Sequence, residues 1–337
     1  SEEGGEPDAE VREGPFAVGF DVAVISPSEA QLAAGDIYMG AYGAPLSRGA
    51  AQGVHDDVYA RAMAIEQGGV GVLLTVLDLP GMGNRISRAI RAGASERTGV
   101  PEEAILVGTT HSHSAPDLMG LWGGVSEAYR DDLIEGTVAS LERAWASRVE
   151  ATLRVGAADA PNRNRRGWED SDESLVSIEA RDGADALIGL YVCYAAHPVI
   201  LGEDNKLISR DYNGYAVDRL EQTLGVPVLL FNGILGDVTP VVPEGEHGDD
   251  FGRAEAYGNL VAEAALVSLE GTEMIRPALT YSHVGWTQSV DNVLFSLAAT
   301  LGILQYDFEM DVVTQQVDTQ ATYLRLGDQV QGVSFPG

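Results

Sequence analysis

Apolar positions along the chain follow two spacings, and each spacing predicts one kind of element. Compact runs rich in Val, Leu and Ile are typical of strands, whereas apolar residues three to five positions apart are typical of helices. The predicted strands cover residues 16–25, 70–79, 105–110, 151–157, 175–179, 186–196 and 226–231, and the predicted helices cover residues 84–94, 126–147, 212–224 and 251–269. Because strands alternate with helices, we expect an α/β fold with a mixed β-sheet core covered by helices.

Turn and cap residues define the limits of several of these elements. Ser126 is a favoured N-cap residue for the helix that follows it. The glycine-rich segment 35–53 contains too many turn residues for regular structure, and Gly327 and Asp328 predict a hairpin between residues 322–326 and 329–334. We divide the chain into a flexible acidic tail at residues 1–14 and one large domain at residues 15–337.

Acidic residues dominate the charge of the chain. The formal net charge is −30, with 51 Asp and Glu against 21 Lys and Arg. This excess repels nucleic acids and anionic membrane surfaces, so we exclude a function in DNA or RNA binding. No run approaches the roughly 18 to 20 consecutive apolar residues of a membrane helix. The acidic start without an initiator Met predicts a secreted, periplasmic or lipid-anchored protein, with a chain that was simply trimmed for expression as the alternative.

Three of the six histidines stand directly after predicted strands. His111 and His113 lie in Gly-Thr-Thr-His-Ser-His-Ser-Ala-Pro after the strand at 105–110, and His197 follows the strand at 186–196. Residues two apart in an extended segment point to the same side, so His111 and His113 are expected to face one pocket. Carboxyl ends of strands are where α/β sheets carry their sites, which favours a functional role over isolated structural histidines.

A His-x-His pattern with a distant third histidine favours a zinc site. Neutral imidazole suits Zn²⁺, and a catalytic zinc site keeps one coordination position open beside three or more protein ligands. A serine hydrolase is the competing chemistry, but Ser112 and Ser114 do not lie in a Gly-x-Ser-x-Gly elbow. A P-loop nucleotide site is excluded because the glycine-rich segment does not end in Gly-Lys-Ser/Thr.

Several sequence blocks together resemble the neutral and alkaline ceramidase family. The blocks are His111-Ser-His113-Ser-Ala-Pro, Ala196-His197, Leu207-Ile-Ser-Arg-Asp-Tyr-Asn-Gly-Tyr-Ala216, Gly236-Asp-Val-Thr-Pro240, and Gly53-Val-His55 with Ala60-Arg-Ala62. They occur in the family's order over about residues 15 to 240, and together they are far more specific than any one of them. The domain at 15–337 is therefore similar to the N-terminal catalytic domain of that family.

The resemblance implies a zinc-dependent amidohydrolase that cleaves the N-acyl amide of ceramide or a related lipid by metal-activated water. By position, it implies His111 and His197 as zinc ligands. His113 and Arg165 correspond to catalytic residues that stabilise the oxyanion or protonate the leaving amine. Arg165 is the arginine of Asn162-Arg-Asn-Arg-Arg166 that best matches the family's Asn-Arg motif.

Two carboxylates and one apolar stretch are candidates for supporting roles. Asp211 and Asp237 are candidates for orienting the ligating imidazoles, with a helix-cap or turn role as the alternative for each. A lipid-like substrate needs an apolar groove beside the metal. The candidates for its walls are Leu118, Met119, Leu121 and Trp122, which otherwise are ordinary core or loop anchors.

Two departures from the family pattern bear on the mechanism and on the extent of the chain. Thr239 stands where the family carries a serine proposed as nucleophile, which favours the route through metal-activated water. The family's glutamate and tyrosine zinc ligands lie farther along the chain than Gly337, so we expect a catalytic domain that a missing C-terminal segment or a partner chain completes. The alternatives are a noncatalytic surface or scaffold protein that retains the fold, and a zinc esterase or lactonase.

Overall fold

A single nine-stranded mixed sheet organises the fold. The computed structural model describes residues 14–43, 46–304 and 308–335. The strands are β1 (Phe16–Val24), β2 (Gly53–Val54), β3 (Tyr59–Gln67), β4 (Val70–Leu77), β5 (Ile105–Thr109), β6 (Val149–Asp159), β7 (Asn162–Asn164), β8 (Ser174–Asp182), β9 (Leu187–Tyr194), β10 (Leu207–Ile208), β11 (Val228–Asn232), β12 (Val238–Pro240), β13 (Glu273–Met274), β14 (Leu279–Ser289), β15 (Gln316–Leu326) and β16 (Val330–Val333). The helices are α1 (Glu29–Ala34), α2 (Asn84–Thr98), α3 (Glu127–Ala146), α4 (Tyr212–Leu224), α5 (Asp250–Ser268) and α6 (Val293–Thr300).

The order of the strands confirms the expected mixed sheet. Along the main sheet the order is β11-β9-β8-β6-β1-β3-β4-β5, and β13 pairs with β6. The pairs β4/β5 and β9/β11 are parallel, and the other pairs along this order are antiparallel. Three smaller sheets lie outside it, namely β2 with β10, β7 with β12, and β14 with β15 and β16.

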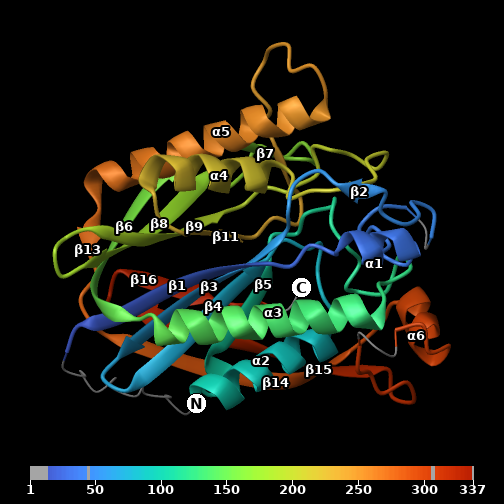
Figure 1. Ribbon diagram of the computed structural model, residues 1–337, viewed down its shortest axis with the longest axis horizontal. Helices are drawn as coiled ribbons and strands as arrows, with labels where there is room; N and C mark the ends of the chain where they lie inside the picture. The colour runs from blue at the N-terminus through green and yellow to red at the C-terminus, as the bar shows by residue number, and fades with distance from the viewer. Residues whose placement is uncertain (1–13, 44–45, 305–307, 336–337) are drawn as a thin grey trace.

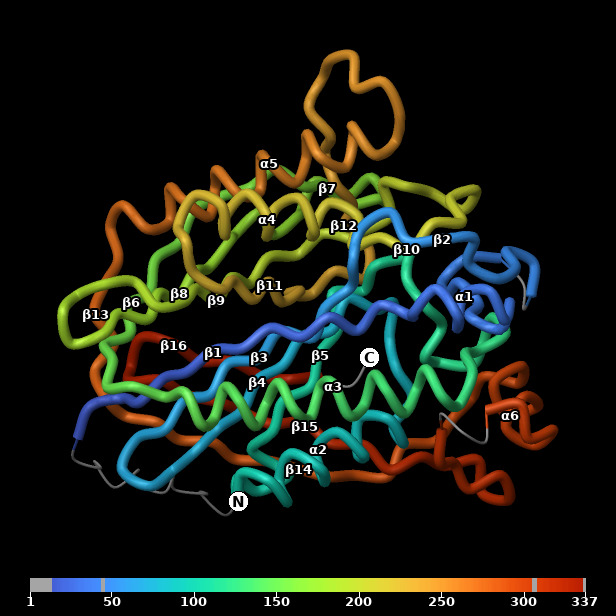
Figure 2. Tube along the Cα trace, in the orientation of Figure 1, coloured from blue at the N-terminus to red at the C-terminus, as the bar shows by residue number. Residues whose placement is uncertain are grey.

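Helices cover both outer faces of the main sheet (Figures 1 and 2). Side chains on a strand point alternately to opposite faces. Leu190 and Val192 of β9 accordingly pack in a cluster with α4 and α5, whereas Tyr191 packs on the second cluster, which includes residues of α2 and α3. The figures show α4 and α5 over the half of the sheet that contains β8, β9 and β11, and α2 and α3 on the side of β1, β3 and β4.

The sheet bends over, so its two halves face each other across an apolar core. A Cβ on Gly189 of β9 would lie 2.3 Å from the ring of Phe20 on β1, and one on Gly108 of β5 would lie 2.9 Å from Phe231 on β11. Only glycine permits this approach. The bend therefore brings β5 and β11, the two ends of the strand order, against each other.

The helix boundaries follow from local chemistry. Helix α4 begins after Asp211, whose carboxylate accepts from the Tyr212 backbone N–H, and ends at Gly225 in the left-handed conformation with φ 71°. Ser126 is the N-cap residue of α3, as expected, but its side chain makes no capping hydrogen bond. Helix α2 extends four residues beyond the predicted end, to Thr98, and Gly99 with φ 74° is its C-cap residue.

Strand β3 is absent from the sequence-based expectation, although it pairs with β1 and β4 along nearly its whole length. Its sequence, YARAMAIEQ, is rich in alanine and contains Arg61 and Glu66, so it lacks the Val- and Ile-rich signature of a strand. The hairpin around Gly327 is present as β15 and β16. Among the helices of the described residues, none is long and apolar enough to cross a membrane. Residues 1–13 of the expected tail lie outside the described residues, as do residues 336–337.

Candidate metal centre

The three histidines after the predicted strands meet in one cluster. His111 and His113 follow β5, and His197 follows β9. Their ligand nitrogens all lie within 4.8 Å of one another. The Nε2 atoms of His111 and His113 are 3.3 Å apart, and the ring centroids of His111 and His197 are 4.9 Å apart. The bend of the sheet brings them together, because it sets the end of β5 beside the ends of β9 and β11.

Backbone hydrogen bonds fix both histidine segments. The Thr110 N–H donates to Leu77 O at 2.8 Å, and the His113 N–H donates to Pro198 O at 3.1 Å, which joins the two segments directly. The His197 N–H donates to Val238 O at 3.0 Å. His111 adopts φ 61°, a left-handed conformation that non-glycine residues seldom take. Strained positions of this kind cluster at functional sites.

Backbone carbonyls also fix the tautomers of two of the rings. His111 Nδ1 bonds to Pro80 O, and His197 Nδ1 bonds to Leu235 O at 2.6 Å. A carbonyl oxygen can only accept, so each Nδ1 carries the proton and each Nε2 presents its lone pair. His113 differs, since its Nδ1 is buried with no hydrogen-bond partner among the described residues.

Burial keeps all three imidazoles neutral near pH 7. It is the largest cause that lowers the pKa of His111 and of His197. Burial lowers the pKa of His113 to about 3, with further contributions from the charges of the two other histidines, Arg48 and Arg165. Neutral imidazole is the form that binds a metal ion. The donor set can therefore hold a metal ion through nitrogen ligands.

The two carboxylates expected to orient the imidazoles make other contacts. Asp211 accepts from the backbone N–H of Leu201 at 3.1 Å and of Tyr212 at 2.7 Å, which is the helix-cap role. Asp237 accepts from Asn164 Nδ2 at 3.0 Å and lies 3.5 Å from Arg166 Nε. For Asp211 these bonds correspond to the helix-cap alternative, and the Nδ1 atoms of His111 and His197 bond to the carbonyls of Pro80 and Leu235.

Arg165 lies on the segment that follows β7, beside the histidine cluster. Its backbone N–H donates to Asp237 O at 2.7 Å, and β7 pairs with β12, whose Val238 carbonyl accepts from His197. The Arg165 side chain is exposed, and its positive charge lowers the pKa of both His113 and His197. The charge therefore acts at the cluster, although the side chain remains accessible to solvent.

Arg48 is a buried arginine at the site that the sequence motifs do not single out. It is 6% exposed, and its guanidinium donates to backbone carbonyls on three segments, among them His113 O. Burial is the largest cause that lowers the pKa of Arg48 to about 10. Tyr42 lies between Arg48 and His113, with its ring centroid 4.9 Å from that of His113. The sequence gives only a weak signal for Arg48, namely an arginine within a glycine-rich stretch.

Two asparagines hold the residue before His111. Asn213, near the start of α4, donates to Thr110 O at 3.3 Å, and Asn232 at the end of β11 donates to the same oxygen. Thr110 Oγ1 and both asparagine Oδ1 atoms are buried without a partner among the described residues. These polar side chains contact the residue that precedes His111. They come together only because β5, β11 and α4 are adjacent in the fold, so the sequence does not show them as a group.

The apolar residues expected near the metal divide into two groups. Leu118 is fully buried in the core, so it supports the fold rather than a groove. Trp122 is a loop anchor, because its backbone N–H donates to Asp117 and its Nε1 donates to Gly43 O at 3.2 Å.

Thr239 lies in β12, directly after Val238, whose carbonyl accepts from His197. Thr239 is therefore one residue away from a direct backbone contact of His197.

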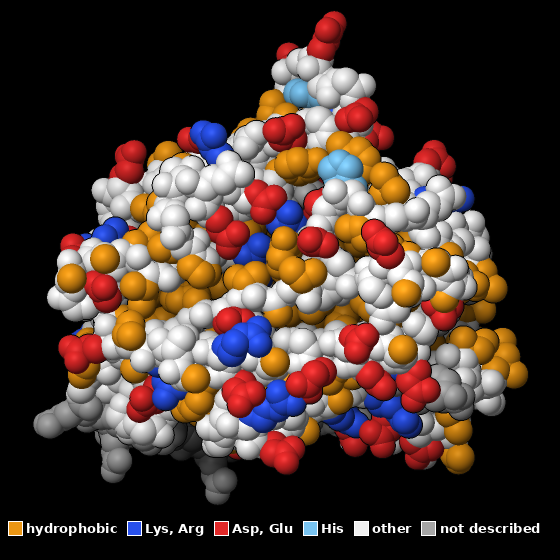
Figure 3. All heavy atoms as spheres, viewed as in Figure 1, with side chains coloured by type: hydrophobic (Ala, Val, Ile, Leu, Met, Phe, Trp, Pro, Cys, Tyr) orange, Lys and Arg blue, Asp and Glu red, His pale blue; other side chains and the backbone are white. Residues whose placement is uncertain are grey.

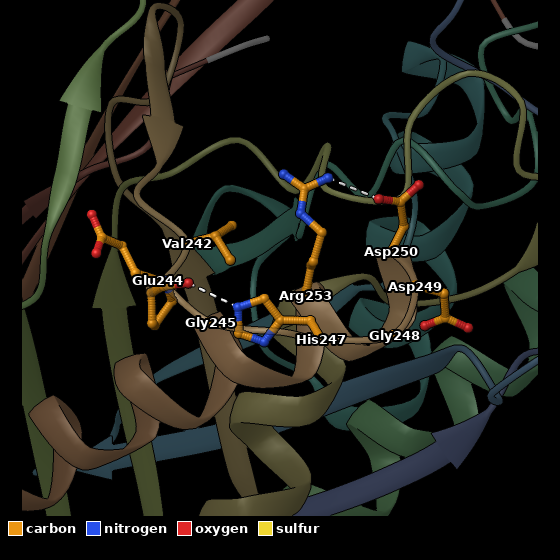
Figure 4. Close-up of a pocket in the computed structure, with 9 residues that line it drawn as sticks. Val242, Glu244, Gly245, His247, Gly248, Asp249, Asp250 and Arg253 are labelled. Atoms are coloured by element: carbon orange, nitrogen blue, oxygen red, sulfur yellow. Dashed lines mark hydrogen bonds and ion pairs between the residues drawn. The ribbon is translucent and has the colours of Figure 1, made fainter.

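A separate hollow lies in the loop that rises above α5 (Figures 1 and 4). Val242, His247 and Arg253 are among the residues that line it, and none of the three clustered histidines does. His247 Nε2 donates to Pro243 O at 2.8 Å, and Arg253 pairs with Asp250 at 2.8 Å. Figure 3 shows acidic side chains spread over the visible face, including this loop, in keeping with the net charge of −30.

The comparisons with known proteins agree with the resemblance of the motifs. No family model matches the chain. It is 25% identical over 198 residues to a neutral ceramidase of Drosophila melanogaster and 26% identical over 189 residues to one of Pseudomonas aeruginosa. These alignments cover 51% and 49% of this chain and 28% of each relative. The chain thus matches little more than a quarter of the length of these curated relatives.

Solved structures extend the similarity to the fold. The crystal structure of neutral ceramidase from Pseudomonas aeruginosa superposes with a TM-score of 0.77 at 19% identity, over 93% of this chain and 61% of that one. A ceramidase complexed with C2 superposes with a TM-score of 0.72 at 21% identity, over 80% of this chain and 46% of that one. The expected resemblance to the neutral ceramidases is confirmed by the curated relatives, and the solved structures show the same fold.

Proposed function

We propose that this chain, a relative of the neutral ceramidases, forms the metal-bearing part of a zinc-dependent hydrolase that cleaves the N-acyl amide of ceramide or a related lipid. The observation that carries the proposal is the cluster of His111, His113 and His197, in which two Nε2 lone pairs are set by backbone carbonyls. The names of the curated relatives support the substrate class.

His111 and His197 are the proposed zinc ligands, through Nε2. Both rings are held at Nδ1, so they need no reorientation when a metal ion arrives. Neutral nitrogen donors suit zinc. A zinc ion held there would act as a Lewis acid on the acyl carbonyl and would lower the pKa of a bound water to about 7.

His113 and Arg165 are the proposed catalytic residues. His113 is neutral, and its Nε2 faces the Nε2 of His111 at 3.3 Å, so this ring can form a hydrogen bond with a substrate amide held at the cluster. Arg165 brings a positive charge to the cluster on an exposed side chain, which can approach the acyl oxygen as negative charge develops there. Thr239 is not assigned a nucleophilic role in this proposal.

The test is metal content together with hydrolysis. The purified protein, with everything that copurifies with it, is analysed for zinc and assayed with a fluorescent N-acyl sphingosine and with a matched ester of the same acyl chain. We expect about one zinc per chain and preference for the amide. Zinc with hydrolysis of the ester alone would replace the amidase by an esterase. A metal-free protein that cleaves neither substrate would favour the noncatalytic alternative.

The proposal also includes export from the cytoplasm, as a secreted, periplasmic or lipid-anchored protein. Its support is the acidic composition of residues 1–14, which is typical of a flexible tether. Residues 1–13 lie outside the described part of the structure. Mass spectrometry of the mature N-terminus in culture supernatant and membrane fractions tests it. Recovery of the protein in the cytoplasm alone would contradict it.

A further inference from the structure

Arg48 is a buried cation that bonds directly to the backbone carbonyl of His113, and each of its N–H donors has a partner. Nε donates to Asn205 O at 3.0 Å, and Nη1 donates to Gly40 O at 2.9 Å and to His113 O. Nη2 donates to Asn205 O and, at 3.5 Å, to Gly202 O. A guanidinium has five N–H donors, so none remains for a substrate.

The carbonyls that Arg48 holds belong to the two segments that carry the histidines. His113 O lies in the segment after β5, and Gly202 and Asn205 lie in the segment that continues from His197. The same two segments touch through Asn205 Nδ2, which donates to Ser114 Oγ at 3.0 Å. Arg48 therefore forms a bridge between the segments from the side of the glycine-rich stretch.

Tyr42 completes this bridge. Its ring lies 5.1 Å from the Arg48 guanidinium carbon, and its hydroxyl donates to Val199 O at 3.4 Å, two residues after His197. Its ring meets the His113 ring edge to face at 4.9 Å. Arg48 and Tyr42 thus restrain His113 at its carbonyl and at its ring.

The bonding pattern requires arginine rather than lysine. Among the described residues, no carboxylate forms an ion pair with Arg48, and its bonded partners are carbonyl oxygens on separate segments. The planar fork of a guanidinium reaches several acceptors in fixed directions, whereas a lysine ammonium offers three donors at one point. A lysine at position 48 would leave at least two of the carbonyl contacts unmade.

We propose that Arg48 is a positioning residue that sets the spacing between the segment of His111 and His113 and the segment of His197, and thereby the affinity of the site for zinc. It acts through backbone carbonyls and contacts neither metal nor substrate. The proposal rests on the proposed function only in taking zinc as the metal.

The experiment compares R48A and R48K with R61K as the matched control. Arg61 is also a buried arginine, at 3% exposure, but it bonds to Glu221 and to Val228 O, away from the histidine segments. Zinc dissociation constants are measured by competition with a chelating dye, with and without 10 mM guanidinium chloride or methylammonium chloride. Histidine side-chain ¹H–¹⁵N spectra of the metal-free proteins give a readout that needs no zinc.

We expect R48A to bind zinc roughly 10 to 100 times more weakly than the parent, as when partners that orient metal ligands are removed. Guanidinium, but not methylammonium, should restore most of the affinity by filling the vacated fork position. R48K should be intermediate, and R61K should lower the melting temperature while leaving zinc affinity within about threefold. The histidine resonances should shift in R48A and return with guanidinium.

Unchanged zinc affinity in R48A would overturn the proposal. Equal losses in R48A and R61K without rescue would also overturn it, because both would then reflect general destabilisation. A parent protein that binds no zinc would refute the proposed function instead. In that case the histidine spectra still decide the role of Arg48, since unshifted resonances in R48A would refute it.

Discussion

Two arginine-bearing segments flank the histidine cluster, and they differ in almost every physical respect. The segment with Arg48 is irregular and buried, and its guanidinium is fully used by carbonyls. The segment with Arg165 follows the short β7 strand, and its side chain is exposed. Both charges lower the pKa of His113.

The difference separates two tasks that a catalytic site needs. A buried arginine with every donor occupied fixes backbone positions and cannot follow a changing substrate. An exposed arginine beside the cluster can move toward charge that develops during a reaction. Substitutions at Arg48 should therefore change metal affinity and stability, whereas substitutions at Arg165 should change turnover alone.

The largest effect is expected from removing the histidines on which both arginines act. H111A should lose its zinc, and its kcat/KM should fall at least about 10³-fold. The remaining residues of the site act together with the metal ion and cannot replace it. Elemental analysis and the N-acyl sphingosine assay measure the two losses. If Arg165 acts only through the histidine cluster, the double variant H111A/R165A should be no less active than H111A. A further large loss in the double variant would place Arg165 in another site.

The next effect concerns stability. R48A should lower the free energy of unfolding by about 2–4 kcal/mol, because several buried carbonyls lose their donor together. R165A should change the free energy by less than about 0.5 kcal/mol, as expected for an exposed side chain. Urea unfolding followed by tryptophan fluorescence measures both variants. Equal losses of unfolding free energy in R48A and R165A would contradict the distinction between the two segments.

The third effect concerns turnover. R165A should lower kcat about 10²-fold with the zinc content unchanged, which is the cost of removing one donor to a developing oxyanion. R165K keeps the charge and should recover part of the loss. Steady-state kinetics on the zinc-loaded protein separate kcat from KM. A rise in KM with kcat unchanged would assign Arg165 to ground-state binding instead.

The smallest effect is expected at Asp237. D237N should change kcat/KM by less than about fivefold, since the carboxylate bonds to Asn164 and to the exposed Arg166 and not to an imidazole. The same assay measures it. A loss comparable to that of R165A would show that Asp237 orders the arginine segment, and the comparison would then have to include it.

The elements with strong local signals could be predicted from the sequence. Helix α4 spans the residues expected from its apolar spacing, because Asp211 and Gly225 mark both ends. Strand β3 could not, since it is defined by hydrogen bonds to β1 and β4 and not by its own composition. Central strands gain their stability from neighbours, which an isolated segment does not display.

Site residues divide in the same way. The sequence singled out His111, His113 and His197 because each follows a strand, and the structure brings them together. It could not identify Arg48, whose acceptors are backbone carbonyls as far as 157 positions away. It named Asp211 and Asp237 as candidates for orienting the imidazoles, beside a helix-cap or turn role, because a carboxylate can be recognised in a sequence whereas a well-placed backbone carbonyl cannot.

The sequence by itself determined the alternating elements, the strand ends that carry the histidines, and the kind of ligand that they offer. These depend on local propensity and on residue chemistry. The tertiary structure alone decided that the sheet bends over, with Gly108 and Gly189 permitting the close contact between its two halves, so that the ends of β5 and β9 meet. It also decided which ring nitrogen faces the centre and which charge is buried beside it. Those outcomes depend on contacts between residues far apart in the chain, and such contacts exist only after the two halves of the sheet have packed together.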